Sequence, residues 1–188
     1  MSAMPHEMNL GMRQAVFLDR DDTILMDTHY MSDPHRIQII PGVKEALQLL
    51  QEANFQLVLI SNQSGVARGL ITIDQVYAIQ KRMCQLLPGI SFAGFEYCFH
   101  HPIDGCPCRK PKPTLIVQAA TRLNVDLSYS FMVGDKESDV AAGNAAGCWS
   151  ILVQQDPQLL LKSTADFVVP NLAAAVQVLL GLHQAKVR

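Results

Sequence analysis

The 188-residue chain contains no apolar run long enough to span a bilayer, and its N-terminus has no basic segment followed by an apolar stretch. We therefore expect neither a membrane anchor nor a secretory signal, and we expect a cytoplasmic protein. The chain also lacks an excess of charge of one sign, since its formal net charge is −2. This balance gives no indication of a nucleic-acid partner or of a membrane-binding surface.

Charged residues are scarce as well, and the cysteines do not form an even set. Because only 17% of the residues are charged and 49% are apolar, intrinsic disorder is not expected. The five cysteines are an odd number, and cytoplasmic thiols stay reduced, so a disulfide framework is not expected either. The length suits a single domain over residues 1–188, in which residues 1–13 look like a loose tail.

Segments typical of buried strands alternate with segments typical of helices along the chain. We expect strands at 15–19, 55–61, 95–100, 130–135, 148–153 and 166–169, and helices at 41–54, 72–87, 112–124, 137–147 and 172–184. Thr72 is a suitable N-cap, Pro113 suits a first helical turn, and Gly147 suits a helix end. This alternation predicts an α/β fold, a Rossmann-like parallel sheet with helices on both faces. In such folds, ligands bind beyond the carboxyl ends of the strands.

Four loops that follow expected strands carry complementary chemistry: "DRDDT", "SNQSG", "HHPIDGCPCRK" and "GDKESD". Asp19 and Asp21 are two residues apart at a strand end, so their side chains can point the same way. Asp135 and Asp139 follow another strand. Clustered acids repel one another unless a cation lies among them, and oxygen ligands favour Mg²⁺. With Lys110 from a third loop, this set is typical of phosphoryl transfer, whereas any one acid alone would be an ordinary solvated loop residue.

The motifs "FLDRDDT", "ISNQSG", "RKPKP" and "VGDKESD" resemble, in this order, the four motifs of the haloacid-dehalogenase (HAD) phosphatase superfamily. The resemblance covers nearly the whole chain. It implies that Asp19 is the nucleophile that accepts the phosphoryl group and that Asp21 is the general acid and then the general base. It further implies that Ser61 and Lys110 hold the phosphoryl oxygens.

The same resemblance implies a Mg²⁺ site. Its ligands would be the carboxylate of Asp19, the backbone carbonyl of Asp21 and the carboxylate of Asp135. Asp139 would support the site from behind, and Thr23 would orient Asp21.

A second candidate metal site lies in the loop "CFHHPIDGCPC". Cys98, His100, Cys106 and Cys108 follow the pattern C-x-H-x₅-C-x-C, which lets the loop fold four ligands onto one tetrahedral zinc. His101 could replace His100 as a ligand, and reduced bystander thiols are the alternative to a metal site. A thioredoxin-like redox pair is disfavoured because its cysteines need two residues between them. Since the protein would fill all four positions, the zinc would be structural and would orient the cations that follow the last ligand.

Within the superfamily, "SNQSGVARG", "CFHHP", "CPCRKP" and "MVGDK" are similar to the heptose-bisphosphate phosphatases. This similarity implies removal of the 7-phosphate of heptose 1,7-bisphosphate, a step in bacterial lipopolysaccharide synthesis, through an aspartyl-phosphate. The histidinol-phosphate phosphatases share the zinc loop and remain an alternative, as does a catalytically weak binding module that keeps the fold. The implied substrate contacts are Asp27, Thr28, His29, Tyr30, Asn62, Gln63, Ser64, Arg109 and Lys136.

The sequence departs from that family at one position and lacks one common feature. Asp22 stands where the heptose phosphatases carry glycine, and the alternation of side chains along a strand predicts that it points away from Asp19 and Asp21. The segments between the motifs are too short for a large cap domain. Because a site without a cap needs no partner chain, we expect a monomer whose substrate is a small phosphorylated sugar.

Overall fold

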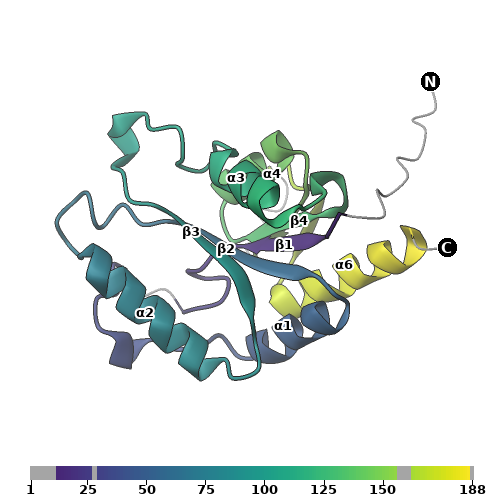
Figure 1. Ribbon diagram of the computed structural model, residues 1–188, viewed down its shortest axis with the longest axis horizontal. Helices are drawn as coiled ribbons and strands as arrows, with labels where there is room; N and C mark the ends of the chain where they lie inside the picture. Colours follow the sequence, from purple (N-terminus) through teal and green to yellow (C-terminus); the bar gives the residue numbers. More distant parts are fainter. Residues whose placement is uncertain (1–11, 27–28, 156–161, 187–188) are drawn as a thin grey trace.

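A computed structural model describes residues 12–26, 29–155 and 162–186 (Figure 1). Six parallel strands in this part of the chain form one sheet in the order β3-β2-β1-β4-β5-β6. The strands are β1 (Ala15–Leu18), β2 (Gln56–Asn62), β3 (Phe92–Cys98), β4 (Phe131–Gly134), β5 (Trp149–Val153) and β6 (Phe167–Val169). The α-helices are α1 (Val43–Glu52), α2 (Ile73–Leu86), α3 (Thr114–Leu123), α4 (Glu137–Ala146) and α6 (Leu172–Lys186). Short 3₁₀-helices are η1 (Pro34–Arg36), η2 (Pro102–Asp104) and η3 (Leu127–Tyr129).

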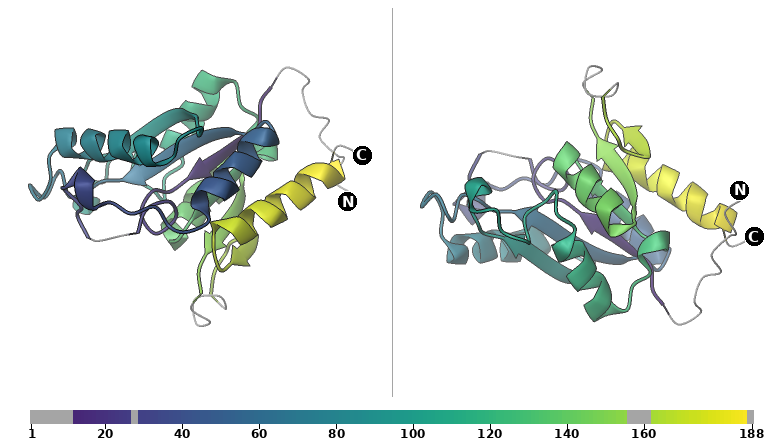
Figure 2. Two further views of the ribbon diagram at one scale, coloured as in Figure 1. Left: turned by 90° about the horizontal axis from the view of Figure 1, so that it is seen from below. Right: turned by 90° about the horizontal axis from the view of Figure 1, so that it is seen from above.

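The sheet forms a central layer with helices on both faces (Figures 1 and 2). Helices α1, α2 and α6 pack on one face, and α3 and α4 pack on the other. All of β1 is buried: Val16 and Leu18 contribute to the core on the α1 side, and Ala15 and Phe17 to the core on the α3 side. A continuous apolar strand of this kind is expected where helices cover both faces of a parallel sheet. The predicted fold class is confirmed.

Local chemistry fixes the helix ends at the predicted residues. The Thr72 side chain accepts a hydrogen bond from the N–H of Gln75, whose side chain accepts the N–H of Thr72, so that α2 begins with a capping box. Pro113 directly precedes α3. Gly147 ends α4 with a φ of 85°, in the left-handed region that glycine adopts without steric cost.

Most predicted boundaries are within one or two residues of the observed ones, and two differences have a structural reason. The third strand covers 92–98 rather than 95–100. Its pairing with β2 shifts register between Leu57 and Val58. Such an irregularity interrupts the alternation of inward and outward side chains by which a strand is recognised in a sequence. The chain then leaves the sheet after Cys98. At the N-terminal side, Arg13 was expected in the loose tail but pairs with Val125, donating to the carbonyl of Asn124 at 2.9 Å. Residues 1–11 lie outside the described part of the chain.

The strand order reverses at β1, which lies between β2 and β4. From β1 the sheet grows outward through β2 and β3 in one direction and through β4, β5 and β6 in the other. Such a reversal opens a crevice beyond the carboxyl ends of the strands. The loops that carry the four motifs follow β1, β2, β3 and β4, so the fold brings them to this edge. None of the described helices combines the length and the apolar composition that crossing a membrane requires.

Candidate active site

A buried lysine joins two of the candidate acids at the crevice. Lys110 Nζ lies 2.8 Å from Asp19 Oδ1 and 2.6 Å from Asp139 Oδ1, and it donates to the carbonyl of Ile60 at 2.8 Å. Burial alone would lower the pKa of Lys110, but the two carboxylates raise it above its usual value. Burial alone would raise the pKa of Asp19, but the charge and hydrogen bond of Lys110, together with a hydrogen bond from the backbone of Arg20, lower it below its usual value. The pair is therefore ionised at neutral pH.

Three carboxylates gather beside this lysine. Oxygen atoms of Asp19, Asp135 and Asp139 all lie within 4.8 Å of one another. Asp135 Oδ1 is buried and has no hydrogen-bond partner among the described residues. Burial, together with the charge of Asp19, raises the pKa of Asp135 to about 7. An orphaned carboxylate oxygen beside two further carboxylates is a donor set that fits a hard cation such as Mg²⁺.

The first turn of α4 holds Asp139 in place. Its Oδ2 accepts the backbone N–H of Lys136 at 3.1 Å, while the Lys136 ammonium lies 3.1 Å from Asp135 Oδ2. The carboxylate of Asp139 packs against Gly134, where an added Cβ would overlap with it. Glycine at the end of β4 is therefore required for this carboxylate to reach Lys110.

Among the described residues, Arg20 and Gln63 donate three hydrogen bonds to the side chain of Asp21, and Thr23 donates none. Arg20 donates from Nε to Asp21 Oδ1 at 2.9 Å and from Nη2 to Oδ2 at 3.0 Å. Gln63 Nε2 donates to Asp21 Oδ2 at 3.1 Å and to Ser61 Oγ at 2.8 Å. Thr23 Oγ1 is buried without a partner in the part of the chain that is described, so the expectation that it orients Asp21 is wrong. Arg20 and Gln63 do so instead.

Asn62 aligns the backbone of the buried lysine. Its amide donates to the carbonyl of Lys110 at 3.1 Å and accepts the N–H of Lys110 at 3.1 Å. This pair of bonds imitates strand pairing and joins the last residue of β2 to a loop residue 48 positions further along the chain. Asn62 was predicted as a substrate contact, and the structure gives it this additional positioning role.

Most of the predicted site residues line two cavities that share Asp21, Asn62 and Lys136. The smaller cavity, about 150 Å³, is lined among others by Asp19, Asp21, Ser61, Arg109, Lys110 and Lys136. The larger cavity, about 240 Å³, is lined among others by His29, Tyr30, Asn62, Gln63, Ser64 and Lys136. Asp27 and Thr28 lie outside the described residues. The nucleophile candidate thus opens onto a small charged cavity beside a wider one.

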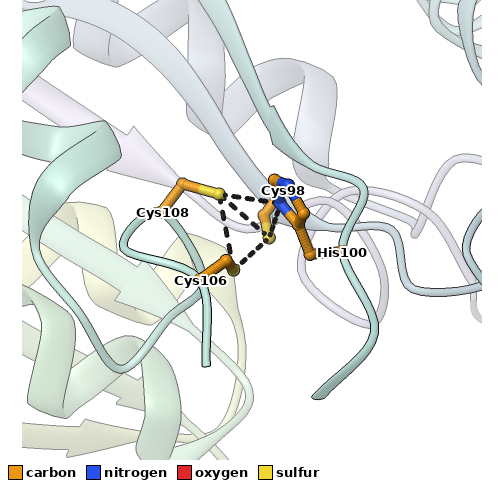
Figure 3. Close-up of side chains that lie close together, drawn as sticks. All are labelled: Cys98, His100, Cys106 and Cys108. Atoms are coloured by element: carbon orange, nitrogen blue, oxygen red, sulfur yellow. Dashed lines mark hydrogen bonds between the residues drawn. The ribbon is translucent and has the colours of Figure 1, made fainter. Parts of the chain in front are cut away.

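The four predicted zinc ligands also lie together (Figure 3). Cys108 Sγ is 3.2 Å from His100 Nδ1, 3.3 Å from Cys98 Sγ and 3.6 Å from Cys106 Sγ, and Cys98 Sγ is 3.6 Å from Cys106 Sγ. These sulfur–sulfur distances are far longer than a disulfide bond of about 2.05 Å. They approach the spacing of about 3.8 Å between ligands of a tetrahedral zinc with bonds of about 2.3 Å. The cluster can therefore hold a metal ion.

The remaining predicted residues have other surroundings. His101 Nδ1 accepts the N–H of Ile103 at 3.3 Å and caps η2, and His101 is not part of the cluster of four side chains that can hold a metal ion. Asp22 is exposed and lines neither cavity. Its φ of 57° lies in the left-handed region, where glycine is favoured and aspartate is tolerated.

Comparison with known proteins gives consistent results. A family model described as HAD-hydrolase-like matches residues 107–175. The D-glycero-beta-D-manno-heptose-1,7-bisphosphate 7-phosphatase of Pasteurella multocida is 37% identical over 182 residues, which cover 91% of this chain and 99% of that protein. The enzyme of the same name from Vibrio cholerae is 42% identical over 144 residues, which cover 72% of this chain and 77% of that protein.

A solved structure agrees with these relatives. The D,D-heptose 1,7-bisphosphate phosphatase from B. bronchiseptica, complexed with magnesium and phosphate, matches with a TM-score of 0.82 at 34% identity, covering 90% of this chain and 99% of that one. Both the sequence and the fold are thus shared over most of the length. The chain belongs to the HAD-like family of D-glycero-beta-D-manno-heptose-1,7-bisphosphate 7-phosphatases.

Proposed function

We propose that this protein is a Mg²⁺-dependent phosphatase that removes the 7-phosphate of D-glycero-D-manno-heptose 1,7-bisphosphate. The observation that carries the proposal is the buried Lys110, which neutralises Asp19 at the mouth of the crevice. The names of the relatives support the sugar bisphosphate as substrate. We further propose that the protein acts in the cytoplasm as a single-domain monomer without a nucleic-acid partner.

In the first step, a carboxylate oxygen of Asp19 attacks the phosphorus. The new bond forms as the bond from phosphorus to the sugar oxygen breaks, and Asp21 gives its proton to that leaving oxygen. Ser61 donates a hydrogen bond to the phosphoryl oxygens, and the positive charge of Lys110 beside them stabilises the negative charge that moves onto them. The products are the sugar, which now carries a hydroxyl group in place of that phosphate, and an aspartyl-phosphate on Asp19.

In the second step, water attacks the phosphorus of the aspartyl-phosphate. Asp21, now a carboxylate, takes a proton from that water, and the bond between phosphorus and Asp19 breaks. Inorganic phosphate leaves, and both carboxyl groups return to their starting states.

The carboxylates of Asp19 and Asp135 and the backbone carbonyl of Asp21 would hold Mg²⁺. When bound, the ion neutralises negative charge on the transferring phosphoryl group. The orphaned Oδ1 of Asp135 supports this assignment. Asp139 acts through Lys110, with which it forms an ion pair, and therefore serves as a supporting acid.

Zn²⁺ held by Cys98, His100, Cys106 and Cys108 is the second proposed metal ion. All four positions would be filled by the protein, which is the composition of a structural rather than a catalytic zinc site. The ion would fix the loop that delivers the next two residues, Arg109 and Lys110, to the crevice.

The two cavities are suited to different parts of the substrate: cations in the smaller one can bind a second phosphate, and the larger one can bind the sugar. Arg109 Nη1 is buried without a hydrogen-bond partner among the described residues, and Arg109 lines the smaller cavity together with Lys136. These two cations are not needed by the reacting phosphate and suit a second one, which an arginine can bind through two oxygens at once. His29, Tyr30 and Ser64 line the larger cavity and are proposed as sugar contacts. Contacts from Asp27 and Thr28 stay a prediction.

A substrate panel tests this proposal. We expect a higher kcat/KM for heptose 1,7-bisphosphate than for histidinol phosphate, abolished by EDTA and restored by Mg²⁺. Asp19→Asn should remove turnover without unfolding the protein, because an amide does not accept a phosphoryl group. Arg109→Ala should lower kcat/KM for the bisphosphate more than for histidinol phosphate. Faster turnover of histidinol phosphate would reverse the substrate assignment. An active Asp19→Asn variant would show that Asp19 is not the nucleophile.

A further inference from the structure

The carboxylate of Asp21 has nearly all of its hydrogen-bonding capacity occupied. A carboxylate offers about four lone-pair positions, two on each oxygen. Arg20 occupies one position on Oδ1 and one on Oδ2, and Gln63 occupies the second position on Oδ2. No described residue occupies the second position on Oδ1. Asp21 lines both cavities, and this position is the one at which its carboxylate can form a further hydrogen bond to a substrate.

The arginine that makes this arrangement is unusually well fixed. Arg20 is 2% exposed, and its carbonyl accepts the N–H groups of Ile24 and Leu25, both at 2.9 Å. Burial alone would lower the pKa of Arg20, but the charge and hydrogen bonds of Asp21, with smaller contributions that include the charge of Asp19, raise it above its usual value. A charged guanidinium donates and never accepts, so it cannot bond to a proton carried on the carboxyl oxygens that it faces. Two parallel bonds also fix the plane of the carboxylate, which a single donor would not do.

The glutamine links the carboxylate to the hydroxyl group of Ser61. Gln63 is 5% exposed, and its Nε2 donates to both Asp21 Oδ2 and Ser61 Oγ. Because Ser61 Oγ accepts from Gln63, its own hydrogen can point elsewhere, toward the small cavity that Ser61 lines. A single amide thus orients two groups that face the same cavity.

We propose that Arg20 and Gln63 are positioning residues for the acid–base step, and that they leave Oδ1 of Asp21 as the oxygen that exchanges the proton. In the first half-reaction this oxygen would give its proton to the leaving oxygen of the sugar. In the second half-reaction the same oxygen would take a proton from the attacking water. The inference rests on the proposed role of Asp21 and goes beyond it by assigning the atom and the residues that present it.

Two variants test the positioning role. Arg20→Lys keeps the charge but loses the two parallel bonds, and Gln63→Met keeps the length but loses the amide donors. We expect kcat for the sugar bisphosphate to fall about 10- to 100-fold in each, with KM within about twofold, because acid–base catalysis contributes about 10²- to 10⁴-fold. The pH profile of kcat should also shift. Matched controls are Arg122→Lys, in an exposed pair with Glu96, and Gln85→Met on the surface of α2, which should retain wild-type kinetics.

A substrate with a good leaving group separates the two half-reactions. p-Nitrophenyl phosphate needs little proton donation in the first step, so Arg20→Lys should still release a burst of p-nitrophenolate equal to the enzyme concentration. The steady rate after the burst should fall, because hydrolysis of the aspartyl-phosphate needs the positioned base. A merely structural defect would reduce the burst as well, in proportion to the unfolded fraction seen by circular dichroism.

A double-mutant cycle decides whether the effect passes through Asp21. In the Asp21→Asn background, Arg20→Lys and Gln63→Met should cause no further loss of kcat, since the group that they position no longer exchanges a proton. Additive losses, a rise in KM at constant kcat, or wild-type kinetics in both single variants would overturn the inference. If Asp21→Asn itself kept full turnover, the proposed acid–base role would fail, and that outcome is distinct from a failure of the positioning role alone.

Discussion

Lys110 Nζ lies 2.8 Å from Asp19 Oδ1 although 91 residues separate the two in sequence. The lysine reaches this place because its backbone pairs with the amide of Asn62 and its ammonium also bonds to the carbonyl of Ile60. Three loops therefore have to assemble before the charge of Asp19 is compensated. The electrostatic balance of the site is a property of the folded sheet edge and not of any one motif.

Replacing Lys110 should leave the negative charges of the neighbouring carboxylates uncompensated. In Lys110→Met, Asp19 and Asp139 lose the buried cation that contacts both of them, and we expect a loss of about 3–5 kcal/mol in the unfolding free energy of the metal-free protein. Turnover should be lost as well. Urea unfolding in EDTA measures the stability, with Lys81→Met on the exposed face of α2 as the control. Adding Asp139→Asn should restore part of the stability, since one uncompensated charge is removed; no restoration would contradict the electrostatic account.

The sequence predicted the sheet, its order of elements and the residues that meet at the crevice, because each depends on a strong local signal. Strand β1 is apolar throughout and ends in acids, and Thr72 and Gly147 cap helices by their own chemistry. The close approach of Cys98, His100, Cys106 and Cys108 was predictable from their spacing in the sequence.

What the sequence did not predict depends on side chains from distant segments. The bonds from Asn62 to Lys110 bridge two loops whose register only the folded sheet sets. The alternation rule predicts that Arg20 points away from Asp21, yet a long side chain can bend back onto its neighbour. The same limit applies to the hydroxyl of Thr23, which is buried without the partner that the motif led us to expect. The local sequence pattern identifies the candidate site residues. Which of their side chains bond to one another depends on the tertiary structure.

The zinc proposal predicts metal content and a kinetic consequence. Elemental analysis of metal-replete protein should give one zinc per chain, and Cys108→Ser should lose it because a hydroxyl is a poor zinc ligand. Activity should fall in this variant as the loop before Lys110 loosens. Cys84→Ser is the matched control, since Cys84 lies on α2 outside the cluster and should retain zinc and activity. Well under one equivalent of zinc in the wild-type protein would rule out the site.

The buried Asp135 predicts how stability and metal binding respond to pH. Its pKa in the folded, metal-free protein is about 7, against a usual value of 3.8, because burial and Asp19 disfavour its charge. The stabilisation from this group is therefore complete below about pH 4 and is lost as pH rises through about 7. We expect the Tm of the protein in EDTA to fall as the pH rises from about 4 to about 7, and to level off above that range.

Magnesium should reverse this trend. Proton and cation compete for Asp135, so Mg²⁺ affinity should increase over the same pH range, and so should the gain in Tm on adding Mg²⁺. Asp135→Asn supplies the control: it should flatten the decline in EDTA and weaken Mg²⁺ binding, both followed by calorimetry. An unchanged pH response in this variant would assign the titration to another group.

Replacing Gly134 with alanine tests whether the position of the Asp139 carboxylate matters for stability and turnover. A Cβ at this position would overlap with the carboxylate of Asp139, so Gly134→Ala should displace that group from Lys110 and lower both stability and kcat. Gly181→Ala is the control: Gly181 lies in α6, nothing lies within 4 Å of an added Cβ, and alanine should stabilise the helix by about 0.5–1 kcal/mol. If both variants had the same Tm and kcat, the close contact at Gly134 would have no functional meaning.

We expect the Asp22→Gly substitution to increase the catalytic efficiency. The residue is exposed, lies outside both cavities and has a φ of 57°, so it places a negative charge near the crevice and holds a backbone conformation that glycine adopts more easily. Asp22→Gly should raise kcat/KM by less than about threefold, and the gain should shrink at high salt because salt screens a through-space charge.

A second substitution at the same position separates charge from backbone. Asp22→Asn removes the charge but keeps a residue that tolerates the left-handed region, so it should reproduce the kinetic gain with little change in Tm. Asp22→Gly should then differ from Asp22→Asn in Tm alone. Steady-state kinetics at low and high salt, with thermal unfolding of the three proteins, measure both effects. A large loss of activity in both variants would mean that the Asp22 carboxylate makes a positive contribution to the reaction, since loss of the charge is the one change that the two variants share.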